Sequence, residues 1–320
     1  MMKKDNSIIS IIIAVLIMVF FFVGCRNHQL DVLNQMPEYV PENDTQNHEW
    51  FNEERIEIQG YSGDAMEIGI SPDGEYLLFN DGNKPNKDMH WSRRIDDRTY
   101  KYQGKVANTV SNKVDGTPSC DDNGNIYFTT LKTYPNSFKT IYISKFQDGV
   151  ALDPAPVNGN IYVKNESQSP KLWVSLDPDI SNDGRLLFYS EGRFVPRVGF
   201  PYPFNVRGAE KIDGEFVKMD DRILENINTD SLEYAPTITS DGLEIFFSRI
   251  GKVNGKPKMV GIYTARRKST NEPFSRPEKI MAITGNVEAP VLSGDESYLY
   301  YHRMDHGVFK VYRVTRKLRR

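Results

Sequence analysis

The sequence is short of cysteine, of net charge and of helical patterning. Its 320 residues include two cysteines and carry a formal net charge of −3. Two cysteines cannot build a disulfide framework, and we expect Cys120, at an apolar position of a strand pattern, to be a buried free thiol. A charge this close to zero lacks the footprint of a nucleic-acid-binding protein, so we expect no nucleic-acid partner. After residue 30 no stretch sustains a helical apolar period, which excludes a helical fold.

Recognised catalytic and metal-binding motifs are also missing. The chain has no G-x-S-x-G, no phosphate loop, no dinucleotide fingerprint and no C-x-x-C. His302 and His306 are four residues apart, but they fall at a strand end and a turn, where that spacing does not form a zinc pair. The acidic pairs Asp121-Asp122 and Asp220-Asp221 have the character of turns. We therefore expect no metal ion and no cofactor.

The N-terminus is the one strongly apolar segment. Lys3 and Lys4 precede the run from Ile8 to Val23, which ends at Gly24 and Cys25. This pattern resembles a bacterial lipoprotein signal. The resemblance implies cleavage before Cys25, lipid on that cysteine, and a mature chain in the cell envelope that faces the periplasm or the outside. The alternative is an uncleaved membrane anchor, although 16 residues is short for a span.

Two further sequence features bear on the location and the boundaries of the domain. Arg26 follows the cysteine in place of the aspartate that favours inner-membrane retention, so we expect an outer-membrane address. The polar, acidic segment up to residue 50 has no period, and we interpret residues 25–50 as a flexible tether after a signal at 1–24. The folded domain is then expected at 51–320.

A hairpin pattern recurs five times along that domain. Tyr234 to Ser248 reads YAPTITSDGLEIFFS, in which a strand pattern enters a Ser-Asp-Gly turn and a second strand, rich in β-branched and aromatic residues, leaves it. The corresponding turn residues are spaced by 50, 60, 58 and 54 residues. Such a period indicates a repeat architecture. The turn residues are Asp73, Asn123, Asp183, Asp241 and Asp295.

Each repeat can be divided into four strands, except the last, which ends after its third. A lone strand pattern at Arg55 to Gln59 precedes the first repeat and could supply the missing fourth strand. Pairing the first strand into the last blade would close a ring and remove an exposed sheet edge. We predict an all-β fold, a β-propeller of five four-stranded blades. Six blades remain the alternative, because the 60-residue step could hide a degenerate one.

The turn also carries a family resemblance. Ser71-Pro72-Asp73-Gly74 with the following Leu-x-Phe type strand is similar to the WD40-like PD40 repeat of TolB-type propellers, and the other four copies are more divergent. The resemblance implies a propeller. It does not imply one function, because such repeats occur in binding scaffolds, periplasmic assembly proteins and domains that gate peptidases.

Candidate functional residues gather at one mouth of the predicted channel. An acidic residue stands just ahead of each first strand, and basic side chains follow several second strands. These carboxylates either pair with the arginines and support blade packing, or act as acid and base in glycoside cleavage. The residues expected for catalysis, if the protein is an enzyme, are Glu67, Asp177 and Glu233. Those expected to bind a ligand are Asp115, Glu288, Arg193, Arg249, Arg303, His302 and Trp91.

Two loops are expected to border this mouth. Residues 191–205 and 81–94 are rich in aromatic residues and proline or basic residues, which suits sugar stacking, peptide capture or a hydrophobic plug. From these features we expect a membrane-tethered, non-catalytic and monomeric propeller that captures a polypeptide or a glycan. The alternative is an enzyme similar to glycoside hydrolases that uses the acidic ring.

Overall fold

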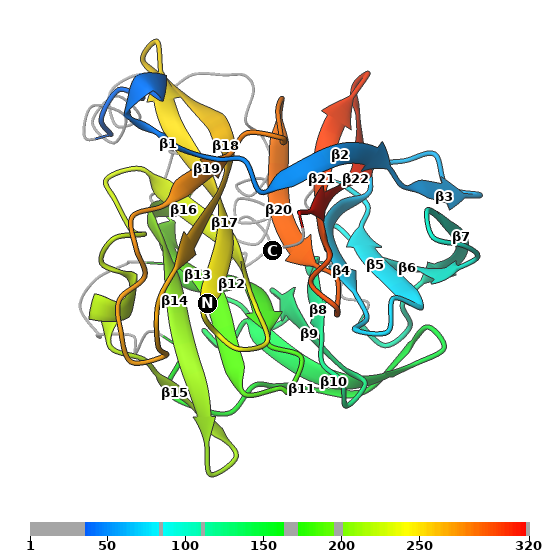
Figure 1. The fold of residues 1–320 in the computed structure, drawn as a ribbon. Coiled ribbons are helices and arrows are strands. Elements are labelled where there is room, and N and C mark those ends of the chain that lie inside the picture. The colour runs from blue at the N-terminus through cyan, green and yellow to red at the C-terminus, as the bar shows by residue number, and fades with distance from the viewer. Residues whose placement is uncertain (1–35, 83–85, 110–112, 163–171, 195–200, 318–320) are drawn as a thin grey trace, which may run out of the picture.

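The computed structural model describes residues 36–82, 86–109, 113–162, 172–194 and 201–317. Five sheets, whose blade strands are antiparallel, stand around a common axis, with the chain running from blade to blade in sequence order (Figure 1). The first strands of neighbouring blades contact one another in a closed inner ring. The fold is therefore the predicted five-bladed β-propeller, and the six-bladed alternative is wrong. Within these ranges no helix is long and apolar enough to cross a membrane.

Each blade is built from consecutive strands that run outward from the channel. The first blade consists of β4 (Met66–Ile70), β5 (Tyr76–Asn80), β6 (Met89–Arg94) and β7 (Thr99–Lys105). The second blade consists of β8 (Asp115–Cys120), β9 (Asn125–Thr130), β10 (Ile141–Gln147) and β11 (Val150–Pro156). The third blade consists of β12 (Leu172–Ile180), β13 (Leu186–Phe194), β14 (Pro201–Ile212) and β15 (Glu215–Lys218). The fourth blade consists of β16 (Leu232–Ile238), β17 (Glu244–Val253), β18 (Lys256–Arg266) and β19 (Glu278–Ile280). The fifth blade contains β20 (Val287–Leu292), β21 (Tyr298–Asp305) and β22 (Val308–Arg316). Two 3₁₀ turns, η1 (Pro41–Asn43) and η2 (Asp221–Leu224), complete the described elements.

The ring closes through the N-terminal part of the chain, as predicted, but with a different strand. β2 (Trp50–Arg55) pairs antiparallel with β22 and supplies the fourth strand of the fifth blade. The expected closing strand, residues 55–59, instead contributes β3 (Glu57–Gln59), which adds in parallel to β7 of the first blade. The chain changes blades at Ile56, whose amide donates to Val311 O at 2.9 Å. The sequence pattern does not predict β2, because this strand lies on an outer edge, where only Trp50 is buried and no apolar alternation is required.

The second half of the expected tether packs on the propeller. β1 (Thr45–Asn47) adds in parallel to β19 on the outer edge of the fourth blade. Met36 is fully buried against residues of the second, third and fourth blades. The part of the tether at 25–35, the signal at 1–24 and Cys25 lie outside the described residues.

The repeated turn is held by the same side-chain hydrogen bonds in several blades. In the first blade the Ser71 hydroxyl accepts the Tyr76 amide at 2.9 Å, and the Asp73 carboxylate accepts both the Ser71 hydroxyl and the Glu75 amide. Gly74 follows with φ of 73°, a left-handed conformation that favours glycine. Equivalent bonds link Ser181 with Asp183, Thr239 with Asp241 and Ser293 with Asp295. The sequence motif is thus a local structural device.

Every first strand carries a β-bulge whose central residue has positive φ. In four blades the amide of this residue donates to a polar side chain from the second strand of the preceding blade. These bonds tie neighbouring blades together beside the channel. The bonds run from Glu67 N to His302 Nδ1 (3.1 Å), from Asp177 N to Thr129 Oγ1 (3.1 Å), from Ala235 N to Ser190 Oγ (2.9 Å) and from Ala289 N to Ser248 Oγ (2.9 Å).

Candidate functional site

The bulge decides which side chains reach the channel. At the bulge residue, or at the residue before it, one side chain of each first strand is partly exposed inside the ring, while its neighbours in the strand are buried. Two residues before the bulge the side chain is buried in every blade. The five expected carboxylates therefore divide into three that reach the channel, Glu67, Asp177 and Glu288, and two that are buried, Asp115 and Glu233. The channel is lined by Glu67, Thr117, Asp177, Tyr234 and Glu288.

Three of these lining residues are carboxylates, from the first, third and fifth blades. Lys87, which is 2% exposed, enters from the loop before β6 and places its ammonium 2.7 Å from Glu67 Oε2. The Tyr234 hydroxyl donates to Glu288 Oε2 at 2.8 Å. The charges of Glu67 and Lys87 both act on Asp177 and on Glu288, which places the four groups around one centre.

The environment of the channel favours the neutral form of two of the carboxyl groups. Burial raises the pKa of Asp177 to about 7; the charge of Glu67 adds to this shift, while a hydrogen bond with Ser190 opposes it. Burial likewise raises the pKa of Glu288 to about 7, opposed by the hydrogen bond from Tyr234. Glu67 differs because it has a direct ammonium partner. One centre thus holds an ion-paired carboxylate beside two carboxyl groups that titrate near neutral pH.

Glu233 and Arg249 do not belong to this centre. Glu233 is fully buried two residues before the bulge, and its carboxylate accepts Arg249 Nε at 2.9 Å, the Thr229 amide at 3.0 Å and the Thr229 hydroxyl at 2.6 Å. The Arg249 guanidinium also lies over the Tyr263 ring, 4.5 Å from its centroid. Asp115 has the same register and is also fully buried. These side chains stabilise the packing of their blades and do not face the channel.

The other expected ligand-binding residues are placed as follows. Arg303 pairs with Glu53 and lies 3.8 Å from the Tyr312 ring centroid within the fifth blade. Trp91 is 8% exposed and packs between Tyr76 and Phe146, so it belongs to the core between the first two blades.

Two of the expected residues remain near the mouth or the channel. Arg193, on β13, is the cross-strand partner of Trp173, which lies at the start of β12 in the third blade. His302 is fully buried beside the channel; burial and the Lys87 charge lower its pKa to about 3, which fits its role as acceptor for the Glu67 amide.

The turn end of the channel is closed by contacts between blades. Asn182 Nδ2 donates to Gly294 O at 3.1 Å, and the Asp122 amide donates to Asn182 O at 2.8 Å. The Ser240 amide donates to Glu296 at 2.7 Å. A Cβ on Gly294 would lie 2.0 Å from the carbonyl oxygen of Pro72, so the turns of the first and fifth blades are in direct contact. All five turns participate, which leaves the opposite end of the channel, the mouth, as the expected route for a ligand.

A hydrophobic cluster covers part of that mouth. It joins the starts of three first strands to Met36 from the N-terminal segment and to Tyr134 from the loop after β9. Phe204 belongs to it and stacks on Tyr234 with 5.6 Å between the ring centroids. The expected 191–205 loop is mostly strand, in β13 and β14, and its tip at 195–200 lies outside the described residues. The cluster comprises Met36, Val114, Leu131, Tyr134, Val174, Leu176, Phe204 and Leu232.

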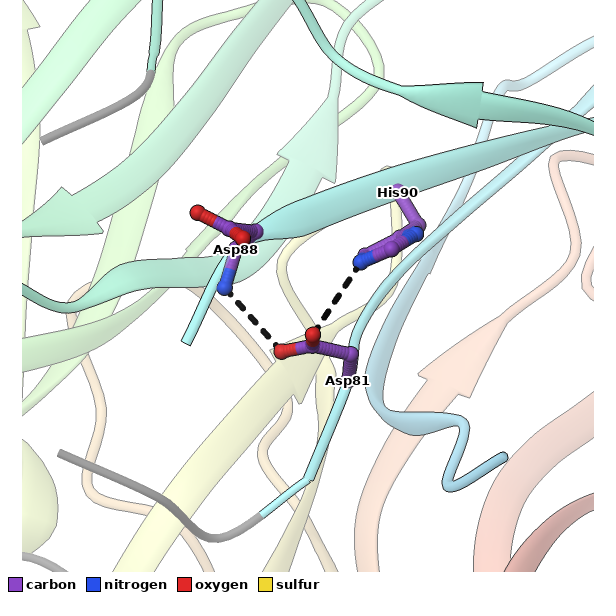
Figure 2. Close-up of side chains that lie close together, drawn as sticks. All are labelled: Asp81, Asp88 and His90. Carbon is purple, nitrogen blue, oxygen red and sulfur yellow. Dashed lines mark hydrogen bonds and ion pairs between the residues drawn. The ribbon is translucent and has the colours of Figure 1, made fainter. Parts of the chain in front are cut away.

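Three features of the candidate site were not predicted from the sequence. Lys87 and Tyr234 carry no signal in the sequence, because Lys87 reaches Glu67 through the path of the loop before β6, and Tyr234 reaches Glu288 through the contact between the fourth and fifth blades. The third is a cluster of Asp81, Asp88 and His90, whose potential ligand atoms lie within 4.8 Å of one another (Figure 2). In the sequence the cluster corresponds to two aspartates and a histidine within ten residues of the expected 81–94 loop.

Comparison with known proteins supports the fold. No family model and no curated protein sequence matches the chain. The structure is similar to the endo-arabinase from Bacteroides thetaiotaomicron, with 12% identity, 83% of this chain and 98% of that chain covered, and a TM-score of 0.51. It is also similar to an exo-β-1,3-galactanase from Clostridium thermocellum, with 11% identity, 80% of this chain and 60% of that chain covered, and a TM-score of 0.51.

TolB from Acinetobacter baumannii is also among the similar structures. The identity is 13%, the match covers 78% of this chain and 53% of that chain, and the TM-score is 0.40, which is too low to carry an argument. At these identities the likenesses concern the fold alone. The relation to TolB-type repeats thus stays an interpretation of the sequence motif.

Proposed function

We propose that the channel centre hydrolyses a glycosidic bond in a glycan that enters through the mouth. One observation carries the proposal: carboxyl groups from three blades surround the channel in two different electrostatic states. Glycoside hydrolysis requires such a pair, one group protonated to assist the leaving oxygen and one ionised to act as base or nucleophile. A site used for binding alone has no need of this difference.

The proposed roles follow from the partners of each group. Asp177, with a pKa of about 7, is the candidate general acid. Glu67 is the candidate base or nucleophile, because its carboxylate forms an ion pair with the Lys87 ammonium at 2.7 Å. Glu288 takes the place that the sequence analysis assigned to Glu233, and the hydroxyl of Tyr234 orients it. Trp173, half-buried near the mouth, offers an aromatic face on which a sugar could stack.

The test is release of reducing sugars from a panel of plant and bacterial polysaccharides. We expect the wild-type protein to cleave at least one of them, and Asp177→Asn and Glu67→Gln to abolish cleavage while the melting temperature changes little. Asp153→Asn is the matched control, since Asp153 is exposed on β11 in a left-handed conformation that asparagine tolerates. A wild-type protein inactive on the whole panel, or Asp177 and Glu67 variants that stay as active as the control, would refute the proposal.

A second candidate function is capture of a glycan or polypeptide without catalysis. The hydrophobic cluster at the mouth favours it, because Met36 and Phe204 cover part of the approach to the carboxylates. In that case the protein binds its ligand at the mouth, and the variants of Glu67 and Asp177 change affinity but leave the ligand intact. Ligand recovered unaltered after long incubation with wild-type protein distinguishes this function from hydrolysis.

We also propose that the protein acts in the cell envelope as a monomer tethered by lipid on Cys25, with an outer-membrane address. The support is the sequence pattern that precedes this residue. Cys25→Ser is expected to block processing or to release the domain from membranes. Unchanged membrane association in a fractionation experiment would contradict the lipid anchor.

A further inference from the structure

A second polar cluster lies outside the channel, where the loop after β5 meets β6. Asp81 follows β5, Asp88 precedes β6, and His90 lies within β6. Figure 2 shows the His90 ring directed at the Asp81 carboxylate; His90 Nε2 is 3.3 Å from Asp81 Oδ2. The Asp88 amide donates to Asp81 Oδ1 at 3.1 Å, which fixes the two aspartates relative to each other. One potential ligand atom from each of the three residues lies within 4.8 Å of the other two.

His90 is held rigidly for this role. The side chain is 4% exposed and its ring stacks between Phe79 and Tyr102, at 5.6 and 5.7 Å between centroids. Its Nδ1 lies 2.7 Å from the Tyr102 hydroxyl. A metal-ligating histidine commonly has such a partner on its other nitrogen, which fixes the tautomer.

The inner nitrogen of this histidine is left without a hydrogen bond. Among the described residues, Nε2 has no hydrogen-bond partner, despite its proximity to Asp81. When Nδ1 carries the ring proton and donates to Tyr102, Nε2 presents a lone pair toward a carboxylate oxygen. In that tautomer the two electron-rich atoms, 3.3 Å apart, repel each other unless both bind one cation.

We propose that Asp81, Asp88 and His90 bind a divalent transition-metal cation, with Zn²⁺ or Mn²⁺ as the class. One imidazole nitrogen with two carboxylates suits such ions better than Ca²⁺ or Mg²⁺, which prefer oxygen ligands alone. Lys105 forms an ion pair with Asp88 and competes with the metal for this carboxylate. Its side chain is 55% exposed, so it can turn into solvent when a metal binds.

The metal would also restrain the segment before β6 that carries Lys87. Lys87 is adjacent to Asp88, and its ammonium pairs with Glu67 while its carbonyl accepts the Asp115 amide at 3.0 Å. A cation on Asp88 therefore anchors the residue next to the lysine that pairs with a channel carboxylate. This link to Lys87 rests on the proposed channel function, whereas metal binding itself does not.

The test is titration of the full chain, stripped with EDTA, with Zn²⁺, Mn²⁺ and Co²⁺, followed by calorimetry and thermal denaturation. We expect one ion per chain, a raised melting temperature, and for Co²⁺ a visible absorption band. Ca²⁺ should bind much more weakly. Asp81→Asn should weaken binding at least about 100-fold and Tyr102→Phe about 10- to 100-fold. Asp153→Asn serves as the control and should bind like wild type.

Lys105→Gln gives the sharpest outcome, because removing the competing ammonium should tighten binding, whereas a purely structural cluster would gain nothing. Absence of stoichiometric binding by all three ions, or binding that survives both Asp81→Asn and His90→Phe, overturns the proposal. Each readout is independent of glycan cleavage, so failure of the channel function leaves the metal result standing. Metal-dependent slowing of hydrogen exchange at residues 86–90 would support the link to Lys87, and equal exchange rates would contradict that link.

Discussion

The first strands of the third and fourth blades each carry an acidic residue near their bulge, with opposite outcomes. Asp177 is the bulge residue of β12 and meets the channel, where burial and Glu67 raise its pKa to about 7. Glu233 lies two residues before the bulge of β16 and is enclosed by Arg249 and Thr229. Two acidic residues at similar positions of the repeat thus differ in their surroundings: one faces the channel and the other is paired within its blade. The position of a carboxylate relative to the bulge, and not its distance from the start of the strand, therefore decides whether it can reach the channel.

The largest expected effect is on catalysis. Asp177→Asn should lower the rate of glycan cleavage about 10²- to 10⁴-fold, the usual contribution of a general acid, with nearly unchanged stability. Because the acid must be protonated and its pKa is about 7, wild-type activity should fall as pH rises above 7. A pH–rate profile of kcat measures this. A rate that keeps rising to pH 9 would remove Asp177 from the role of acid.

The next effect is on stability and concerns the other member of the comparison. Glu233→Ala leaves Arg249 buried without its carboxylate and should cost about 3–5 kcal/mol of unfolding free energy. Urea denaturation measures the loss. The double variant Glu233→Leu with Arg249→Met should recover part of it, because neither charge is then buried alone. A single variant as stable as wild type would mean that Glu233 is not a packing residue.

A pH-dependent effect on stability is expected for Asp179, which lies two residues after Asp177 in β12. Asp179 is buried, accepts Ser119 Oγ at 3.1 Å and the Ile238 amide at 2.9 Å, and burial raises its pKa to about 7. A carboxyl group with a raised folded-state pKa contributes stability that is present below its unfolded pKa near 4 and is lost as pH rises through 7.

Asp179→Asn should therefore flatten the decline of stability between pH 4 and pH 7 relative to wild type. The change is about 1.4 kcal/mol per pH unit for one such group. Melting curves at several pH values measure it. Parallel curves for the variant and the wild type would show that Asp179 does not titrate in this range.

The smallest expected effect tests the bonds that hold the bulges. Ser248→Ala removes the acceptor of the Ala289 amide between the fourth and fifth blades and should cost about 1–3 kcal/mol. The corresponding Ser190→Ala should cost a similar amount, because its bond to the Ala235 amide is equivalent. Chemical denaturation of the two variants provides the comparison. Two neutral substitutions would indicate that water replaces these hydroxyls.

Much of the fold could be predicted from the residues. The Ser-x-Asp-Gly turn is a local device, since hydrogen bonds within six residues hold Ser71, Asp73 and Tyr76 together, so its recurrence revealed the blades. The count of five and the closure of the ring followed from spacing. The closing strand did not, because β2 lies on an outer edge where one buried tryptophan suffices and the apolar period is absent.

The candidate site was predicted only in part. Glu67, Asp177 and Glu288 line the channel as the repeat pattern suggested, but Glu233 and Asp115 do not, because a shift of two residues relative to the bulge places them in the packing. Lys87 and Tyr234 reach the carboxylates through contacts between residues 20 and 54 apart in the chain, for which a strand pattern gives no signal. His302 was expected to bind a ligand, and its ring instead accepts the amide of Glu67.

The sequence by itself determined the blades, their number and the ring, because turn hydrogen bonds and strand periodicity act over a few residues and repeat along the chain. Only the tertiary structure decided which carboxylates meet. Whether an acidic side chain faces the channel depends on a bulge, and its electrostatic environment depends on partners that the fold brings to it. Lys87 and Arg249 come from the same blades as Glu67 and Glu233, whereas Asp177 is influenced by Glu67, and Glu288 is bonded by Tyr234, from other blades. Electrostatic environment is a property of the assembled ring, so it could not be obtained from any one repeat.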